Sequence, residues 1–280
     1  MTLAVEWKAE AGQFLETDGK LLEYACFGPT PAKAMTIVLL HEGLGCLALW
    51  RDFPKAIAEA TGCGVFVYSR AGYGRSDTVI LPRPLDYMTR EATDVLPKIL
   101  DVIGVRRTIL LGHSDGATIA AIYTGSHEDH RVRGLILMAP HFFCEEMGVQ
   151  EIAKAKVAFE QGDLSTRLGK YHSDPTVAFR GWSDAWLDPD FAQWDASDVI
   201  DFLRVPVFAI QGHDDQYGTI AQVDTLVDRC YAPVDVAILD DCQHAPHFDQ
   251  PDVVIAKVRE FVERLLKFEP QEIGDASDPV

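Results

Sequence analysis

A serine lies in a glycine-flanked turn, G-x-S-x-G, where residues 112–116 read GHSDG. The run RTILLG (107–112) before it predicts a strand, and the residues after it predict a helix. Such a strand-to-helix turn holds its serine in a strained backbone conformation, with the hydroxyl above the sheet. Gly112 and Gly116 leave room for the neighbouring strand and helix, and the amides that open the helix favour a developing negative charge. The pattern predicts that Ser114 is a nucleophile.

A serine hydroxyl is a weak nucleophile by itself and needs a base that a carboxylate orients. Two acids and two histidines follow the later predicted strands VPVFAIQG and VDVAILD: Asp214 and Asp215 after the first, His244 and His247 after the second. The carboxyl ends of parallel strands meet at one edge of a sheet, where ligands bind in open α/β sheets. The spacing therefore predicts that one of these acids and one of these histidines lie near Ser114.

Strand and helix patterns alternate along the chain. Buried strands are predicted at 34–40, 63–68, 107–112, 132–139, 205–212 and 234–240, and helices at 47–60, 87–103, 114–123 and 252–267. This alternation predicts the α/β class, with a mostly parallel sheet covered by helices on both faces. Asp18-Gly19, between two alternating runs, predicts an N-terminal antiparallel hairpin with a tight turn. Pro97 predicts an irregularity in its helix.

One long stretch interrupts the alternation. Residues 141–204 are helical and aromatic with no convincing strand, which predicts a small helical cap between the core segments 1–140 and 205–268. The acidic tail 269–280 is predicted to be disordered. Most large side chains of the cap should form its own core. The residues expected to line an apolar pocket over the serine are His141, Phe143, Trp182 and Trp186.

In element order and in four motifs, the sequence resembles the α/β-hydrolase superfamily from about residue 20 to 267. The resemblance implies the α/β-hydrolase fold, a nucleophile, an acid and a histidine in that chain order, and no cofactor. Its D-x-R-G-x-G-x-S motif is matched by SRAGYGRSD, although Ser69 and Ala71 stand where the acid and the arginine usually fall. That turn is structural in most members of the superfamily.

The resemblance also implies which acid and base act. The G-x-x-D that follows this strand in the superfamily matches Gly212 to Asp215, which implies that Asp215 orients the base and that Asp214 forms local hydrogen bonds. The base of the superfamily corresponds to His244 in QHAPH, although Gln243 replaces the usual glycine. His247 is the competing candidate.

A third motif concerns the oxyanion hole. HEGLG (41–45) resembles the H-G-x-x-G of the superfamily and implies that the amides of Gly43 and Asp115 hold the oxyanion. His41 is expected to tie the loop down by hydrogen bonds. Glu42 replaces the usual glycine. We expect its carboxylate to point to solvent; the alternative is that it lines the site and repels anionic substrates.

The resemblance implies a serine hydrolase of the esterase, lactonase and C–C hydrolase branch, which cleaves a small to medium carboxylic ester or lactone. A C–C bond hydrolase of aromatic ring-cleavage products and a thioesterase are the alternatives. Haloalkane dehalogenases and most epoxide hydrolases place aspartate where Ser114 stands, whereas haloperoxidase-like relatives keep the serine. The same scaffold also serves as a non-catalytic receptor in some lineages, and the intact triad argues against that use here.

Composition limits the partners. The 280 residues carry a net charge of −18, which argues against binding to nucleic acid or an anionic membrane surface. Six scattered cysteines without C-x-x-C indicate a reduced, cytoplasmic protein, and we expect neither a signal peptide nor a membrane span. Six of the nine histidines fall at predicted strand ends, but their spacing matches no zinc motif, so we expect no metal. The expected partner is a small acyl compound, and a homo-oligomer is left open.

Overall fold

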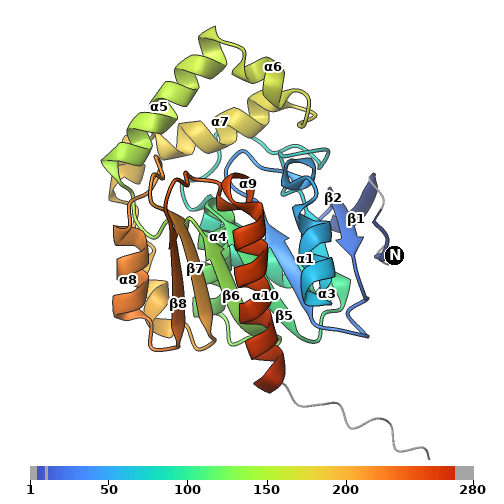
Figure 1. Cartoon of the computed structure of the whole chain (residues 1–280). Helices are drawn as coiled ribbons and strands as arrows, with labels where there is room; N and C mark the ends of the chain where they lie inside the picture. Colours follow the sequence, from blue (N-terminus) through green and yellow to red (C-terminus); the bar gives the residue numbers. More distant parts are fainter. Residues whose placement is uncertain (1–4, 10–11, 269–280) are drawn as a thin grey trace, which may run out of the picture.

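The computed structural model describes residues 5–9 and 12–268 (Figure 1). Over these residues the strands form one eight-stranded sheet in the order β1-β2-β4-β3-β5-β6-β7-β8. The strands are β1 (Gln13–Thr17), β2 (Lys20–Phe27), β3 (Thr36–Leu40), β4 (Gly64–Tyr68), β5 (Thr108–His113), β6 (Val132–Met138), β7 (Val207–Gly212) and β8 (Val234–Leu239). All six predicted parallel strands are present, and the predicted α/β-hydrolase fold class is confirmed.

The N-terminal hairpin forms at the predicted turn. Thr17 of β1 pairs with Lys20 of β2, so the two residues between them make the whole connection. Asp18 and Gly19 have φ values of 51° and 70°, the left-handed conformation that a tight primed turn requires. β2 then pairs antiparallel with β4, whereas every pairing from β4 to β8 is parallel. The hairpin therefore extends one side of a parallel sheet.

The central strands are apolar along their whole length because helices cover both faces of the sheet. On one face α1 (Phe53–Thr61) packs against α10 (Pro251–Phe268), and Figure 1 shows this pair in front of the sheet. On the other face lie α3 (Leu96–Ile103), α4 (Asp115–Ser126) and α8 (Ala221–Arg229). Each face has its own buried apolar cluster, and together these clusters hold the strand ends in fixed positions.

The helix at 87–103 is irregular, as predicted. It consists of α2 (Tyr87–Arg90), a π-helical turn η2 (Glu91–Val95) and α3, whose second residue is Pro97. Proline lacks an amide N–H, so the regular hydrogen-bond ladder is interrupted one turn before it. Tyr87, at the start of this helix, is buried beneath the site described below.

The stretch between β6 and β7 is helical in the structure. It contains α5 (Glu146–Gln161), α6 (Leu164–Leu168), α7 (Pro175–Trp186) and the 3₁₀ turns η3 (Pro189–Gln193) and η4 (Ser197–Phe202). In Figure 1, α5, α6 and α7 lie beyond the edge of the sheet where the parallel strands end. We call residues 141–204 the insertion. The predicted disorder of residues 269–280 concerns a segment outside the described residues.

The longest helix of the described chain, α10, is amphipathic and carries several charges. No helix in residues 5–9 and 12–268 has the length and apolar character needed to cross a membrane.

Candidate active site

Ser114 stands between β5 and α4 with φ 55° and ψ −120°, a strained conformation for a residue with a side chain. The two glycines of the motif explain how this turn fits. A Cβ on Gly116 would lie 2.0 Å from the Leu40 carbonyl oxygen, and one on Gly112 would lie 2.3 Å from the Ala117 nitrogen. Both contacts are with backbone, so neither glycine can be replaced without moving a strand or a helix.

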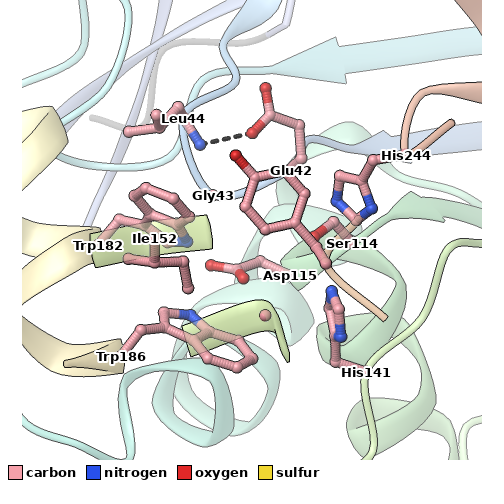
Figure 2. Close-up of a pocket in the computed structure, with 12 residues that line it drawn as sticks. Glu42, Gly43, Leu44, Ser114, Asp115, His141, Ile152, Trp182, Trp186 and His244 are labelled. Atoms are coloured by element: carbon pink, nitrogen blue, oxygen red, sulfur yellow. Dashed lines mark hydrogen bonds between the residues drawn. The ribbon is translucent and has the colours of Figure 1, made fainter. Parts of the chain in front are cut away.

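Asp215 and His244 form a close pair. His244 Nδ1 lies 2.8 and 2.9 Å from the two carboxylate oxygens of Asp215, and the side chain of Asp215 is 1 % exposed. An ionised carboxylate can only accept hydrogen bonds, so Nδ1 carries the proton and Nε2 is left as an acceptor. In Figure 2 the His244 ring lies beside Ser114. An imidazole held in this tautomer has the arrangement needed to take a proton from a hydroxyl.

Further donors hold the Asp215 carboxylate in place. Gln211 Nε2 donates to Oδ2 at 2.8 Å, and the backbone N–H of Tyr217 donates to Oδ1 at 2.8 Å. Burial acts to raise the pKa of Asp215, but the charge and hydrogen bond of His244, together with the Tyr217 amide, bring that pKa below its ordinary value. The carboxylate is therefore ionised at neutral pH.

The two competing candidates lie elsewhere. The side chain of Asp214 is 54 % exposed and lies 3.3 Å from the neighbouring His213 ring, so its contact is local. His247 is buried against Trp50 and Phe53, with ring centroids 5.0 and 5.2 Å away. Burial lowers the pKa of His247 to about 3. Among the described residues, neither of these two side chains forms a hydrogen bond with Asp215 or His244.

The loop after β3 lies against the start of α4. Gly43 and Asp115 both line the same cavity as Ser114. His41 holds this loop as predicted: its Nδ1 donates to the Glu42 carbonyl at 2.7 Å, and its Nε2 accepts the Arg70 amide at 3.0 Å.

Arg70 connects the two sides of this arrangement. Its guanidinium donates to the carbonyls of His41 and Glu42 at 2.5 and 3.1 Å, and it lies 3.9 Å from the Asp115 carboxylate. All of the Arg70 side chain is buried. The SRAGYGRSD turn is therefore structural, as the resemblance implied, and its arginine ties the loop after β3 to the turn at Ser114. The motif does not predict this role, because Arg70 stands one residue before the position of the usual arginine.

A cavity of about 80 Å³ lies between the sheet edge and the insertion (Figure 2). It is lined by Glu42, Gly43, Leu44, Ser114, Asp115, His141, Gly148, Ile152, Trp182, Trp186, Tyr217 and His244. Three of the four residues expected to form the apolar pocket are among these: His141, Trp182 and Trp186. The fourth, Phe143, is not, and that prediction was wrong: its backbone bridges to Asp195 and its side chain packs against the main core instead.

The expectation that the Glu42 carboxylate points to solvent was also wrong. The Glu42 side chain does not point to solvent but lines the cavity, where Oε2 accepts the Leu44 N–H at 2.6 Å. This short turn directs the carboxylate back over its own loop, and Figure 2 shows the hydrogen bond. Burial raises the pKa of Glu42 above its ordinary value. The sequence alone could not decide this because a side chain in a loop can point either to solvent or into the protein.

A polar chain underlies the cavity. Trp186 Nε1 donates to the Tyr87 hydroxyl at 3.0 Å, and that hydroxyl donates to Asp115 Oδ2 at 2.5 Å. The chain links helix α7 of the insertion to the first residue of α4. Burial raises the pKa of Asp115 above its ordinary value, although Arg70 and the Tyr87 hydroxyl act in the other direction. Only the fold brings Tyr87 to this place.

His141 and Tyr217 complete the wall near His244. Their ring centroids lie 5.6 and 4.8 Å from that of His244. Burial lowers the pKa of His141 to about 4, so this imidazole is neutral at pH 7. Tyr217 lies two residues after Asp215 in the same loop, and this proximity is the signal that could have identified it. In the described part of the chain, no three His, Cys, Asp or Glu side chains are grouped so that they could hold a metal ion.

The comparison with known proteins agrees with this geometry. Residues 36–165 match the family described as alpha/beta hydrolase fold. The structure of the enol-lactonase from Burkholderia xenovorans LB400 superposes with a TM-score of 0.71 at 20 % identity, over 90 % of this chain and 100 % of that one. The chain is an α/β-hydrolase-fold protein. The resemblance to the α/β-hydrolase superfamily found in the sequence is thereby confirmed.

Two curated relatives extend the comparison. The bifunctional esterase/perhydrolase DCH of Acinetobacter calcoaceticus is 22 % identical over 234 residues, which are 73 % of this α/β-hydrolase-fold chain and 82 % of the relative. A protein of Caulobacter segnis named as a carbamate hydrolase, RutD, is 29 % identical over 100 residues, 35 % of this chain and 36 % of the relative. The chain thus spans only about a third of the length of the second relative.

Proposed function

We propose that this protein is a serine hydrolase that cleaves a small to medium carboxylic ester or lactone through an acyl-enzyme on Ser114. The observation that carries the proposal is the Asp215–His244 pair, closed by contacts of 2.8 and 2.9 Å, on the same cavity as a strained Ser114. Nucleophile, base and orienting acid are the minimum set for this chemistry.

The proposed first step forms the acyl-enzyme. His244 Nε2 takes the proton of the Ser114 hydroxyl as its oxygen attacks the substrate carbonyl carbon. The carbonyl oxygen becomes negative, and the backbone amides of Gly43 and Asp115 donate hydrogen bonds to it. As the bond to the leaving group breaks, His244 gives its proton to the departing oxygen.

The second step releases the acid. Water loses a proton to His244 and attacks the acyl carbonyl, a second oxyanion forms in the same place, and the Ser114 oxygen leaves with the proton from His244. Asp215 stays ionised throughout and stabilises the imidazolium that appears in both steps. Its pKa below the ordinary value is consistent with that role.

Cavity size limits the substrate. The cavity beside Ser114 has a volume of about 80 Å³ and is partly open to solvent, so the group of the substrate that it holds is small. A short acyl chain therefore fits better than a long or polycyclic one. We propose that the insertion acts as a cap, since Trp182 and Trp186 of α7 form the side of the cavity opposite Ser114. A C–C bond hydrolase and a thioesterase would use the same three residues.

Activity-based labelling combined with a substrate panel tests the proposal. A fluorophosphonate should label the wild-type chain, and esters, lactones and thioesters of short acids should be compared at neutral pH. Ser114→Ala should lose labelling and at least about 10³-fold in turnover, because the hydroxyl is the attacking group. Ser126→Ala, at the exposed end of the same helix, is the matched control and should retain both. Turnover by Ser114→Ala near the wild-type rate would refute the nucleophile assignment.

A further inference from the structure

The cavity contains acidic side chains that take no part in the proposed reaction. Of the twelve residues that line it, two are carboxylic acids, Glu42 and Asp115, and none is lysine or arginine. Glu42 Oε2 accepts the Leu44 N–H, whereas Oε1 has no hydrogen-bond donor among the described residues. A half-buried carboxylate with a free oxygen needs water or a ligand to compensate it.

Asp115 presents a second free acceptor. Its side chain is 0 % exposed, Oδ2 accepts the Tyr87 hydroxyl, and Oδ1 is buried without a partner. Figure 2 shows its carboxylate pointing between Trp182 and Trp186. Arg70 lies 3.9 Å from Oδ2 on the side away from the cavity, so it offsets part of this charge and leaves Glu42 as the uncompensated acid.

Aromatic rings surround these two acids. Trp182, Trp186 and Tyr217 line the cavity, and the Trp182 and Tyr217 rings meet edge to face at 6.5 Å. The indole of Trp186 is held by its hydrogen bond to the Tyr87 hydroxyl at 3.0 Å. Aromatic faces attract cations, most strongly where water is excluded, and rings combined with carboxylates are the usual means of binding ammonium groups.

The surroundings leave the negative charge of Glu42 in place. Glu42 is close enough to act on Tyr217, whose pKa is raised to about 12 by burial and then by Glu42 and other acids. The lysines of α5 do not oppose Glu42, because Lys154 pairs with Glu151 and Lys156 pairs with Asp184 at 3.2 Å. The whole chain carries a net charge of −18, which raises the local concentration of cations at such a site.

We propose that this cavity selects ester substrates that carry a compact ammonium group on the alcohol, close to the scissile bond. Glu42 would supply the counter-charge, and Trp182, Trp186 and Tyr217 would supply the apolar, cation-attracting walls. The claim about substrates rests on the proposed hydrolase function. The preference for an ammonium group concerns binding and can be measured without turnover. Anionic esters would be excluded by the same two carboxylates.

Binding of choline and of its uncharged isostere 3,3-dimethylbutanol tests this independently of turnover. Isothermal titration of each compound into the full-length chain should give at least about ten-fold tighter binding of choline, in line with a desolvated cation–aromatic contact reinforced by a carboxylate. Glu42→Gln keeps the shape and the acceptor for the Leu44 amide, and it should reduce that ratio several-fold. Glu260→Gln, exposed on α10, removes the same charge far from the cavity and should leave the ratio unchanged.

Equal binding of the two compounds, or a preference that Glu42→Gln leaves intact, would overturn the proposal. A second pair, the acetate esters of the same two alcohols, connects it to catalysis. A choline preference in binding without hydrolysis of any ester would uphold the ammonium site and contradict the proposed function. Hydrolysis of both esters at equal kcat/KM, together with equal binding of the two alcohols, would contradict the ammonium site and uphold the proposed function.

Discussion

Replacing Asp215 by asparagine should abolish most turnover without unfolding the protein. The carboxylate oxygens lie 2.8 and 2.9 Å from His244 Nδ1, and they also accept hydrogen bonds from Gln211 and the Tyr217 amide at 2.8 Å each. An asparagine fits the same space, but its amide group can turn its NH₂ toward Nδ1. The imidazole then takes the other tautomer, with the proton on Nε2, and can no longer accept the proton of the Ser114 hydroxyl.

The expected loss can be estimated from this change. The wrong tautomer and the missing counter-charge for the imidazolium together cost up to about 10⁴-fold in kcat in enzymes of this kind. At about 1.36 kcal/mol per ten-fold change, that corresponds to roughly 5.4 kcal/mol of transition-state stabilisation. The removal of a buried acid whose pKa lies below its ordinary value also removes stability that is present above the unfolded pKa and lost as the pH falls through the folded value.

The assay is the steady-state turnover of one short p-nitrophenyl ester at neutral pH, with folding checked by circular dichroism. Asp214→Asn is the matched control. That side chain is 54 % exposed and lies 3.3 Å from the ring of the neighbouring His213, so turnover should change by less than about two-fold. An active Asp215→Asn beside an inactive Asp214→Asn would refute the assignment of the acid and leave the hydrolase proposal standing.

Two further changes test the base and the fold. His247→Leu should leave turnover measurable, whereas His244→Ala should abolish it. Burial lowers the pKa of His247 to about 3, so between about pH 6.5 and 3 the unfolded chain binds one more proton than the folded chain. In this range the wild-type free energy of unfolding falls as the pH falls. His247→Leu removes this contribution, and denaturant titrations should show a fall that is smaller by up to about 1.4 kcal/mol per pH unit. Gly116→Ala places a Cβ 2.0 Å from the Leu40 carbonyl oxygen and should cost about 1–3 kcal/mol or more. Gly169→Ala, with its nearest atoms 3.5 Å away, is the control, and an unchanged denaturation midpoint for Gly116→Ala would contradict the argument.

Local chemistry made much of this fold predictable from the sequence. Apolar β-branched runs such as residues 107–112 can be buried on both faces only in a sheet covered by helices, and Asp18-Gly19 requires the left-handed turn that the hairpin adopts. Pro97 interrupts its helix because it lacks an N–H, whatever the tertiary surroundings. The placement of Ser114 followed in the same way from two glycines, because a Cβ at Gly112 or Gly116 would lie only 2.3 or 2.0 Å from a backbone atom.

Tertiary structure decided what distant segments do together. Asp214 and Asp215 have the same chemistry, and only the turn after β7 buries one against His244 and leaves the other exposed. The carboxylate of Glu42 accepts a hydrogen bond from the Leu44 amide within a loop that Arg70 and His41 also hold.

The residues beneath the cavity likewise could not be predicted from the sequence. Tyr87 reaches Asp115 and Trp186 from a helix that carries no catalytic motif. The wrong expectation for Phe143 has a related cause, since its backbone bridge to Asp195 turns the side chain toward the core. A sequence determines which side chains a strand end can offer. The packing of elements far apart in the chain selects which of those side chains share one cavity, because burial and hydrogen bonding there depend on partners that no local pattern specifies.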